Sequence, residues 1–253
     1  MDTKPTIGFL ITLCSRNQNY TTLGHSDLFR WLLPSIFNTY EPDKFNYKLF
    51  IGYDDDDEFY LKYHDKLKKR LGNMAEISVL KGCQKNPCKA WNILLKENID
   101  KADYFYQIGS DITILSKGWS SYFVRLLQKN NNLGIAGGVD KSYWFARILE
   151  NQNGIVENGF FHKTHYKIFK TFFNERFKTW YSDDYITRIY MLNDCCYLSP
   201  NILFRNMNRV GQIAYNDRYK PDTAIKDSWL EIANSDAKKI FDYAQRVLIF
   251  NKN

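Results

Sequence analysis

The first 140 residues alternate between short apolar runs and amphipathic segments. Five apolar runs predict buried strands: Ile7–Leu13, Tyr47–Tyr53, Ala75–Leu80, the first part of Ala102–Leu115, and Gly134–Val139. Four segments between them predict helices: Ser26–Tyr40, Glu58–Leu71, the segment that begins at Asn86-Pro87, and Trp119–Gln128. A chain that alternates in this way predicts an α/β fold, with a doubly wound, mostly parallel central sheet flanked by helices.

Local residues set expected boundaries for these elements. Pro34 should kink or split the helix over Ser26–Tyr40, because proline cannot donate the helical hydrogen bond. Gly72-Asn73 should end the helix over Glu58–Leu71. Asn86-Pro87 can start the next helix, with proline at its first position.

After Asp140 the pattern changes. A loop or short hairpin is expected over Tyr143–Glu157, and residues 193–224 have no clear pattern. A strand is expected over Asn158–His162, followed by helices over Tyr166–Phe173, Asp183–Leu192 and Ile225–Val247. No linker rich in proline, glycine or serine marks a second domain. We therefore expect a single catalytic domain over residues 1–224, with residues 225–253 forming a C-terminal helix packed on it.

The strongest candidate for chemistry is the end of the apolar strand within Ala102–Leu115. That run stops abruptly on Gly109, Ser110 and Asp111. Ligands of open α/β sheets bind at the carboxyl ends of the strands. A carboxylate there can hold Mg²⁺, or by analogy Mn²⁺, against phosphate oxygens. The alternative is that Asp111 is only a turn residue after a strand.

Two further acidic groups fall at predicted strand or helix ends. Four aspartates follow the second strand, Asp54–Asp57. They can form a solvated loop that caps the next helix, and one of them can also hold a ribose or a base. The pair Asp183-Asp184 can cap a helix or, beside Trp180 and Tyr181, supply a general base.

Two histidines form an H-x-x-H sequence, His162 and His165. They share a face only if the segment is helical, and it straddles a predicted strand end. Each can be a turn or half-buried histidine. The functional alternative is that one of them, His165, is a metal ligand.

Composition bounds the class of protein. Hydrophobic residues make up 44% of the 253 and aromatic residues 17%, which suits a packed enzyme. The net charge of +7 is compatible with a lysine-rich surface or an anionic ligand. The sequence has no long basic block of the kind that would predict a nucleic-acid surface. The five cysteines match no zinc or CxxC pattern. We expect reduced thiols, no transmembrane segment, no signal peptide and a cytoplasmic location.

Several nucleotide-binding and hydrolase motifs are absent. The sequence has no GxxxxGK[ST] loop, no GxGxxG after the first strand and no GxSxG. These absences argue against a P-loop ATPase, an ordinary dehydrogenase and an α/β-hydrolase.

From Ile7 to Asp222 the order of motifs resembles the GT-A glycosyltransferases, within them the family-2-like enzymes. The segments that carry the resemblance are Ile11–Arg16, Asn86-Pro87 with Ala90–Asn92, Tyr104–Asp111 with Gly118-Trp119, Gly137–Asp140, His162–His165 with Ile168-Phe169, Trp180–Tyr185, and Arg218-Tyr219. One departure concerns the metal-binding element. Where the family has two acids, this chain has Gly109-Ser110-Asp111, with one.

The resemblance implies transfer of a sugar from a nucleotide-diphosphate donor, a UDP-sugar, to a glycan or other hydroxyl acceptor. It implies that Asp111, with His165, binds Mn²⁺ or Mg²⁺, and that Asp184, or Asp183 beside it, is the general base of an inverting reaction. The residues that it implies for the nucleotide-sugar are Thr12, Ser15, Arg16, Asp54, Asn92, Ser110 and Arg218. Two alternatives stay open: a retaining transferase of the same fold, and a degenerate GT-A domain that only binds a carbohydrate or a partner.

Overall fold

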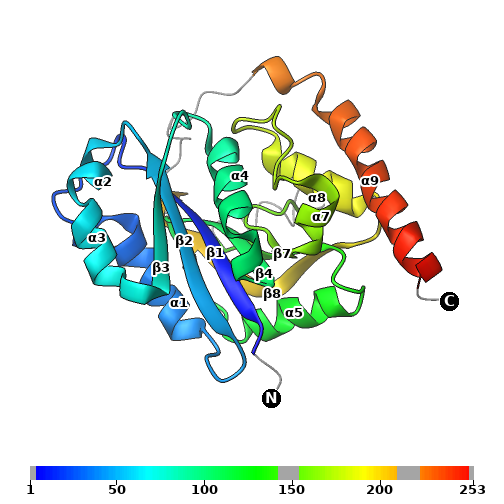
Figure 1. Ribbon diagram of the computed structural model, residues 1–253, viewed down its shortest axis with the longest axis horizontal. Helices are drawn as coiled ribbons and strands as arrows, with labels where there is room; N and C mark the ends of the chain where they lie inside the picture. The colour runs from blue at the N-terminus through cyan, green and yellow to red at the C-terminus, as the bar shows by residue number, and fades with distance from the viewer. Residues whose placement is uncertain (1–3, 142–153, 210–222, 251–253) are drawn as a thin grey trace.

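A computed structural model of the protein describes residues 4–141, 154–209 and 223–250 (Figure 1). Within these residues, eight strands form one sheet in the order β3-β2-β1-β4-β7-β6-β8-β5. The strands are β1 (Thr6–Leu13), β2 (Asn46–Asp54), β3 (Ala75–Leu80), β4 (Tyr104–Gly109), β5 (Ile112–Ile114), β6 (Ile135–Asp140), β7 (Phe160–His162) and β8 (Cys196–Asn206).

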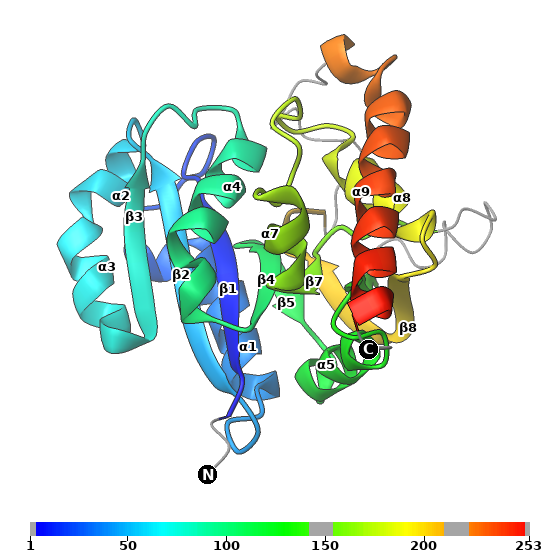
Figure 2. The ribbon, with the colours of Figure 1, turned by 45° about the vertical axis from the view of Figure 1, so that its right-hand side comes forward.

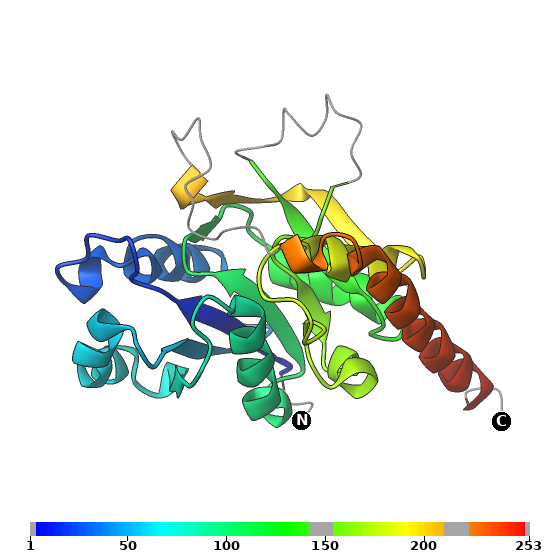
Figure 3. The ribbon, with the colours of Figure 1, turned by 90° about the horizontal axis from the view of Figure 1, so that it is seen from above.

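The α-helices in the described residues flank this sheet on both faces (Figure 3). They are α1 (Leu33–Thr39), α2 (Glu58–Lys62), α3 (His64–Leu71), α4 (Pro87–Asn98), α5 (Trp119–Gln128), α7 (Thr164–Phe169), α8 (Ser182–Met191) and α9 (Trp229–Phe250). The α/β fold with a helix-flanked sheet is therefore confirmed. None of these helices combines the length and the apolar character that a membrane span needs.

The sheet is mixed, and its parallel part comes first in the chain. Strands β3, β2, β1 and β4 run parallel, as the alternating pattern predicts. Strand β7 is antiparallel to both of its neighbours, β4 and β6. The prediction of a mostly parallel sheet thus holds for the amino-terminal half, and the second half mixes directions.

Two apolar layers lie on the two faces of the sheet. Because side chains alternate along a strand, Phe9 and Ile11 of β1 pack on one face and Leu10 packs on the other. The first layer joins the sheet to α1, α3 and α5. The second layer joins it to α4, α8 and α9, which lie in front of the sheet in Figure 1. In Figure 2 α9 stands alongside α8, and the two helices pack on each other.

Two predicted helices are interrupted. The segment before Pro34 forms a π-helix, Leu28–Leu32, in which the Leu33 N–H donates to the Leu28 carbonyl. Since Pro34 cannot donate to a carbonyl four residues back, a wider turn ahead of it fits the sequence. The expected helix over Glu58–Leu71 is split at Tyr63, whose hydroxyl donates to the Thr21 carbonyl at 3.0 Å.

The region after residue 192 is more regular than the sequence predicts. The expectation of irregular structure over residues 193–224 is wrong for its first part, where β8 pairs with both β6 and β5. Strand β5 was not predicted. The expected loop over Tyr143–Glu157 falls largely outside the described residues. The division into residues 1–224 and 225–253 stays a prediction.

Candidate functional site

Three parallel strands end level with one another at one edge of the sheet. Thr12 of β1 pairs with Gly52 of β2 and with Gly109 of β4. The loops that follow these strands carry Ser15-Arg16, Asp54–Asp57 and Ser110-Asp111. These three loops therefore start from the same carboxyl edge of the sheet, where ligands of open α/β sheets bind.

Asp57 joins the first two of these loops. Its carboxylate accepts hydrogen bonds from the Ser15 backbone N–H at 2.7 Å and the Ser15 hydroxyl at 2.6 Å. It also accepts from the Tyr60 N–H at 3.1 Å and so caps α2. Only 2% of Asp57 is exposed. The predicted helix cap within the four aspartates is Asp57, and the hydroxyl hydrogen of Ser15 is used to hold it.

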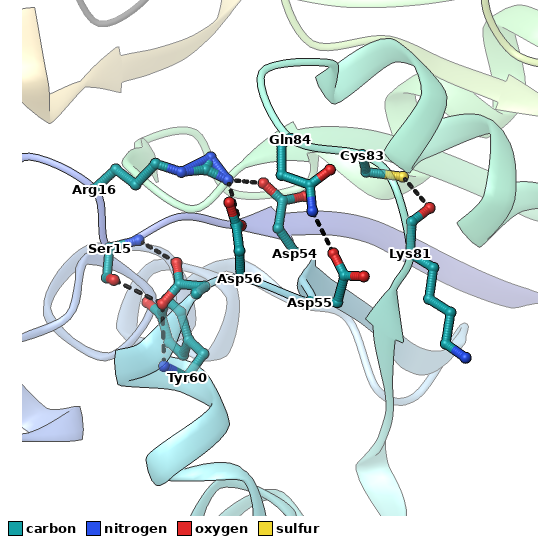
Figure 4. Close-up of polar contacts among 10 residues, drawn as sticks. Ser15, Arg16, Asp54, Asp55, Asp56, Tyr60, Lys81, Cys83 and Gln84 are labelled. Atoms are coloured by element: carbon teal, nitrogen blue, oxygen red, sulfur yellow. Dashed lines mark hydrogen bonds and ion pairs between the residues drawn. The ribbon is translucent and has the colours of Figure 1, made fainter.

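Arg16 lies between two of the other aspartates. Its guanidinium forms an ion pair with Asp54 and a second, at 3.3 Å, with Asp56 (Figure 4). A third of the Arg16 side chain is exposed, against 13% of the Asp54 side chain. The fork of guanidinium donors is suited to holding carboxylates or phosphates. Arg16 and Asp54 thus form a charged pair at the sheet edge, with the Gln84 side chain donating to Asp55 nearby.

Asp111 lies in the tight turn between β4 and β5. Its Oδ2 accepts a hydrogen bond from the Asn208 side chain at 2.8 Å, and its carbonyl accepts from the Met207 N–H at 2.8 Å. A Cβ at Gly109 would lie 2.5 Å from Oδ1 of Asp111, so glycine is needed for this carboxylate to fold back. Ser110 between them is buried. The Asn208 amide therefore holds the carboxylate on its Oδ2 side, while the Met207 N–H holds the backbone of the same residue.

The acidic pair Asp183-Asp184 lies in the first turn of α8, and both side chains are half-buried. Carboxylates are stabilised at that end of a helix by the backbone dipole. Burial raises the pKa of the Cys88 thiol at the start of α4, and the charge of nearby Asp183 adds to the increase. The starts of α4 and α8 therefore lie close together.

A second set of contacts joins α8 to the end of β4. The Thr187 hydroxyl accepts from the Val156 N–H at 2.8 Å. Two residues further on, the Asn158 side chain accepts from the Gly109 N–H at 3.3 Å. The Thr187 hydroxyl in turn donates to the Asp183 carbonyl at 2.6 Å, so this segment connects the first turn of α8 to the turn that carries Asp111.

Two residues from the sequence prediction have structural roles away from this edge. Asn92 is 9% exposed; its amide donates to the Phe173 carbonyl, and its oxygen accepts from the Phe172 and Phe173 N–H groups. Since its hydrogen-bonding groups hold this loop, we do not retain Asn92 as a ligand residue.

His165 is a core residue, which corrects its assignment as a metal ligand. It is 2% exposed, and its Nδ1 lies 2.5 Å from the Tyr190 hydroxyl. Its Nε2 lies 2.9 Å from the Thr171 carbonyl and 3.0 Å from that of Phe172, so Nε2 carries the proton. With both nitrogens occupied by protein groups, neither is available to a metal.

Two other residues predicted for the nucleotide-sugar are Thr12 and Arg218. Thr12 is half-buried at the end of β1, at the edge described above. Arg218 lies outside the described residues.

Asn208, the partner of Asp111, was missed, because the stretch around it has no pattern that indicates a strand. In the described parts of the chain no three histidine, cysteine, aspartate or glutamate residues gather as a metal-binding group.

Comparisons with known proteins identify the fold. The sequence matches no protein-family model, and no curated protein matches it significantly. The solved structure of S. aureus TarS is similar to this chain with a TM-score of 0.52 and 12% identity, over 79% of this chain and 36% of that one. TarS 1–349 in complex with UDP is similar at a TM-score of 0.51 and 12% identity, over 79% and 59%.

TarS 1–349 without UDP gives a TM-score of 0.52 at 13% identity, over 79% of this chain and 59% of that one. The chain thus spans between about a third and three fifths of the length of these structures. At this identity the likeness establishes the fold alone, which is GT-A-like.

Proposed function

We propose that this protein is a glycosyltransferase that moves a sugar from a nucleotide-diphosphate donor to a hydroxyl acceptor. The observation that carries the proposal is that the Arg16–Asp54 pair and Asp111 follow strands that end level at one sheet edge, and that α8 is linked by hydrogen bonds to the Asp111 turn. A donor site needs a cationic group for phosphates, a carboxylate for a cation or ribose, and a base for the acceptor. The family-2-like assignment is part of this proposal.

A uridine donor is supported by the GT-A-like neighbour. TarS, a glycosyltransferase, has been solved with UDP. In our proposal Ser15, Arg16 and Asp54 hold the nucleoside, with Thr12 and Ser110 at the strand ends beside it. Arg218 is proposed for the diphosphate.

The residues around Asp111 fit a hard divalent cation in the donor complex. Mg²⁺ and Mn²⁺ take oxygen ligands and often use one protein carboxylate together with phosphate oxygens and waters. Asp111 offers that carboxylate, held on one side by Asn208. The cation, when bound, would neutralise the charge of the leaving diphosphate. Ser110 replaces the second acid, so the phosphates would have to supply more of the ligands.

Asp184 is the proposed general base, with Asp183 as its alternative. The acceptor oxygen forms a bond to the anomeric carbon while the bond from that carbon to the diphosphate oxygen breaks. Asp184 takes the acceptor proton, and attack opposite the leaving group inverts the configuration. Its place in the first turn of α8 supports this role, because the Thr187 hydroxyl joins the Asp183 carbonyl to residues 156–158, which contact the start of the Asp111 turn.

The test combines donor binding with turnover. The wild-type chain should bind UDP in calorimetry and release it from a UDP-sugar when an acceptor is present. Asp184→Asn should lower turnover by about 10²–10⁴-fold with UDP affinity unchanged. The matched control is Asp43→Asn, an exposed aspartate before the opposite end of β2, which should behave as wild type. Full turnover by Asp184→Asn would exclude Asp184 as the base.

Two alternatives have distinct outcomes. A retaining transferase of this fold needs no general base, and nuclear magnetic resonance of the product anomer separates it from the inverting enzyme. The single acid of Gly109-Ser110-Asp111 favours a second function, a GT-A-like domain that only binds a carbohydrate or partner. Absence of binding to every member of a nucleotide-sugar panel, with and without Mn²⁺, would favour that function.

A further inference from the structure

Two aromatic side chains from distant parts of the chain stack beside the acidic pair. Tyr181, the residue before α8, lies parallel to Trp229, the first residue of α9, with ring centroids 5.9 Å apart and an interplanar angle of 17°. Both residues are half-buried. The neighbouring pair Phe177 and Tyr185, in contrast, is 1% exposed at each residue and belongs to the core. The Tyr181–Trp229 stack therefore lies at the rim of the core, with part of its surface open.

Tyr181 has an unusual backbone for an aromatic residue. Its φ of 64° and ψ of 1° are in the left-handed region. Among the described residues with positive φ it is the only aromatic one, and the others are glycine, asparagine, lysine and aspartate. A bulky side chain in this conformation costs about 1 kcal/mol or more, and such strain gathers at functional sites. Glycine or asparagine would start α8 at lower cost but would not supply the ring that packs on Trp229 and on the second apolar layer.

The backbone of Tyr181 ties the stack to the proposed chemistry. Its carbonyl accepts the first helical hydrogen bond of α8, from the Tyr185 N–H at 2.8 Å. Asp183 and Asp184 follow it within the same turn. A group that rests against the stack is thus presented beside the proposed base.

We propose that Tyr181 and Trp229 form the acceptor subsite and that the acceptor is a carbohydrate. This inference rests on the proposed function. One face of a sugar ring carries C–H groups that pack on a flat aromatic surface, while its hydroxyls project toward polar groups at the edge. Polar residues lie close to the stack in sequence: Lys178, Lys226 and Asp227 are exposed, and Ser228 precedes Trp229.

Other occupants fit this surface less well. A nucleobase could also stack, but the candidate nucleoside residues Arg16 and Asp54 follow β1 and β2, whereas α8 contacts β8, four strands from β1 in the sheet order. A lipid chain would need a wider apolar surface than two rings among charged residues. The carbohydrate acceptor uses both the aromatic plane and the polar border.

A printed glycan array, probed with the full chain in the presence of UDP, tests the proposal. Wild type should bind a defined group of glycans, and Trp229→Ala should lose at least about tenfold in apparent affinity. Trp229→Leu keeps apolar volume without the flat face and should lose a similar amount, whereas Trp229→Tyr should retain binding. The matched control is Phe241→Ala, which removes another aromatic residue of α9, 54% exposed, and should bind as wild type.

Calorimetry with UDP alone separates this proposal from the proposed function. The Trp229 variants should bind UDP as wild type does, which also shows that they are folded. If the wild-type chain binds glycans through Trp229 but does not bind UDP, the subsite stands and the transferase assignment fails. If it binds UDP but no glycan, or if Trp229→Ala and Trp229→Leu bind glycans like wild type, the acceptor subsite is refuted.

Discussion

The hydroxyl of Tyr185 donates a hydrogen bond to Asp236 at 2.8 Å, which joins the first turns of α8 to the middle of α9. Asp236 also accepts from the Asn174 amide at 2.8 Å and pairs with Lys239 at 2.7 Å. Burial alone would raise the pKa of Asp236, but these three partners outweigh it and hold the pKa below its usual value. Because Tyr185 is next to Asp184, this carboxylate fixes the turn that carries the acidic pair.

Removal of Asp236 should destabilise the protein strongly. Asp236→Ala leaves the buried Tyr185 hydroxyl without its acceptor and Lys239 without its partner. Breaking a buried, hydrogen-bonded charge in this way costs about 3 kcal/mol. Equilibrium unfolding in urea measures the change as a lower midpoint with an unaltered slope.

The control for Asp236 lies on the same helix. Asp242 forms an ion pair with Lys238 at 3.4 Å, but the two side chains are 48% and 77% exposed. An exposed pair contributes about 0.5 kcal/mol or less, so Asp242→Ala should leave the urea midpoint nearly unchanged. If the two variants lowered the urea midpoint equally, the buried hydrogen bonds of Asp236 would contribute no more to stability than an exposed ion pair.

Local patterns predicted much of the fold, and non-local pairing explains most of what was missed. The bounds of β3 and α5 are those expected, because Ala75–Leu80 and Trp119–Gln128 carry complete strand and helix signals. Strand β8 was missed because Pro200 interrupts its apolar pattern. The register with β6 shifts at the same place, between Gly137 and Val139, so the strand exists through pairing with distant neighbours.

In the candidate site, too, contacts between residues close in sequence were predicted and contacts between distant residues were missed. The helix cap offered by Asp54–Asp57 depends on residues close in sequence, and Asp57 supplies it. The support of Asp111 by Asn208 spans 97 residues, and no local signal reveals it. His165 shows the opposite case, in which a spacing typical of metal ligands is used to fill and hydrogen-bond a core.

Buried His165 should make the protein sensitive to acid. Burial lowers its pKa to about 4, from an ordinary value of 6.5, and the Phe172 and Thr171 carbonyls offset this only in part. The unfolded chain therefore binds a proton between pH 6.5 and 4 that the folded chain does not, so stability falls as the pH falls through this window. At pH 4.5 this group alone should remove about 2.5 kcal/mol relative to neutral pH.

Urea midpoints at pH 7 and pH 4.5 measure this effect. His165→Gln, which can retain one hydrogen bond to the loop carbonyls, should lower stability at pH 7 and reduce the loss between the two pH values. His162, whose pKa burial also lowers to about 4, adds a loss of the same sign. The matched control is His25→Gln, an exposed position that should keep the wild-type pH dependence. An unchanged dependence in His165→Gln would contradict the assignment.

Gly138 should tolerate no side chain, because β8 passes directly over it. A Cβ there would lie 2.5 Å from the Ile202 carbonyl oxygen, and backbone cannot move aside as a flexible side chain can. Gly138→Ala should therefore cost about 2 kcal/mol or more and lower the thermal midpoint. At Gly24 the nearest atom to an added Cβ is the Thr22 hydroxyl at 3.7 Å, so Gly24→Ala should change stability by less than about 1 kcal/mol. A Gly138→Ala variant as stable as Gly24→Ala would mean that β6 and β8 do not pair as described.

The proposed cation site makes a prediction about metal removal. If Asp111 supplies the protein carboxylate, chelation with EDTA should abolish most sugar transfer and Mn²⁺ should restore it. Asp111→Asn should raise the Mn²⁺ concentration needed for half-maximal activity by about 10–100-fold, while Asn208→Ala, which only removes support from that carboxylate, should have a smaller effect of the same sign. Asp43→Asn serves again as the exposed control and should titrate as wild type. Full transfer by EDTA-treated protein, with no heat from Mn²⁺ in the presence of UDP, would show that Arg16 and the other cationic groups neutralise the diphosphate without a metal.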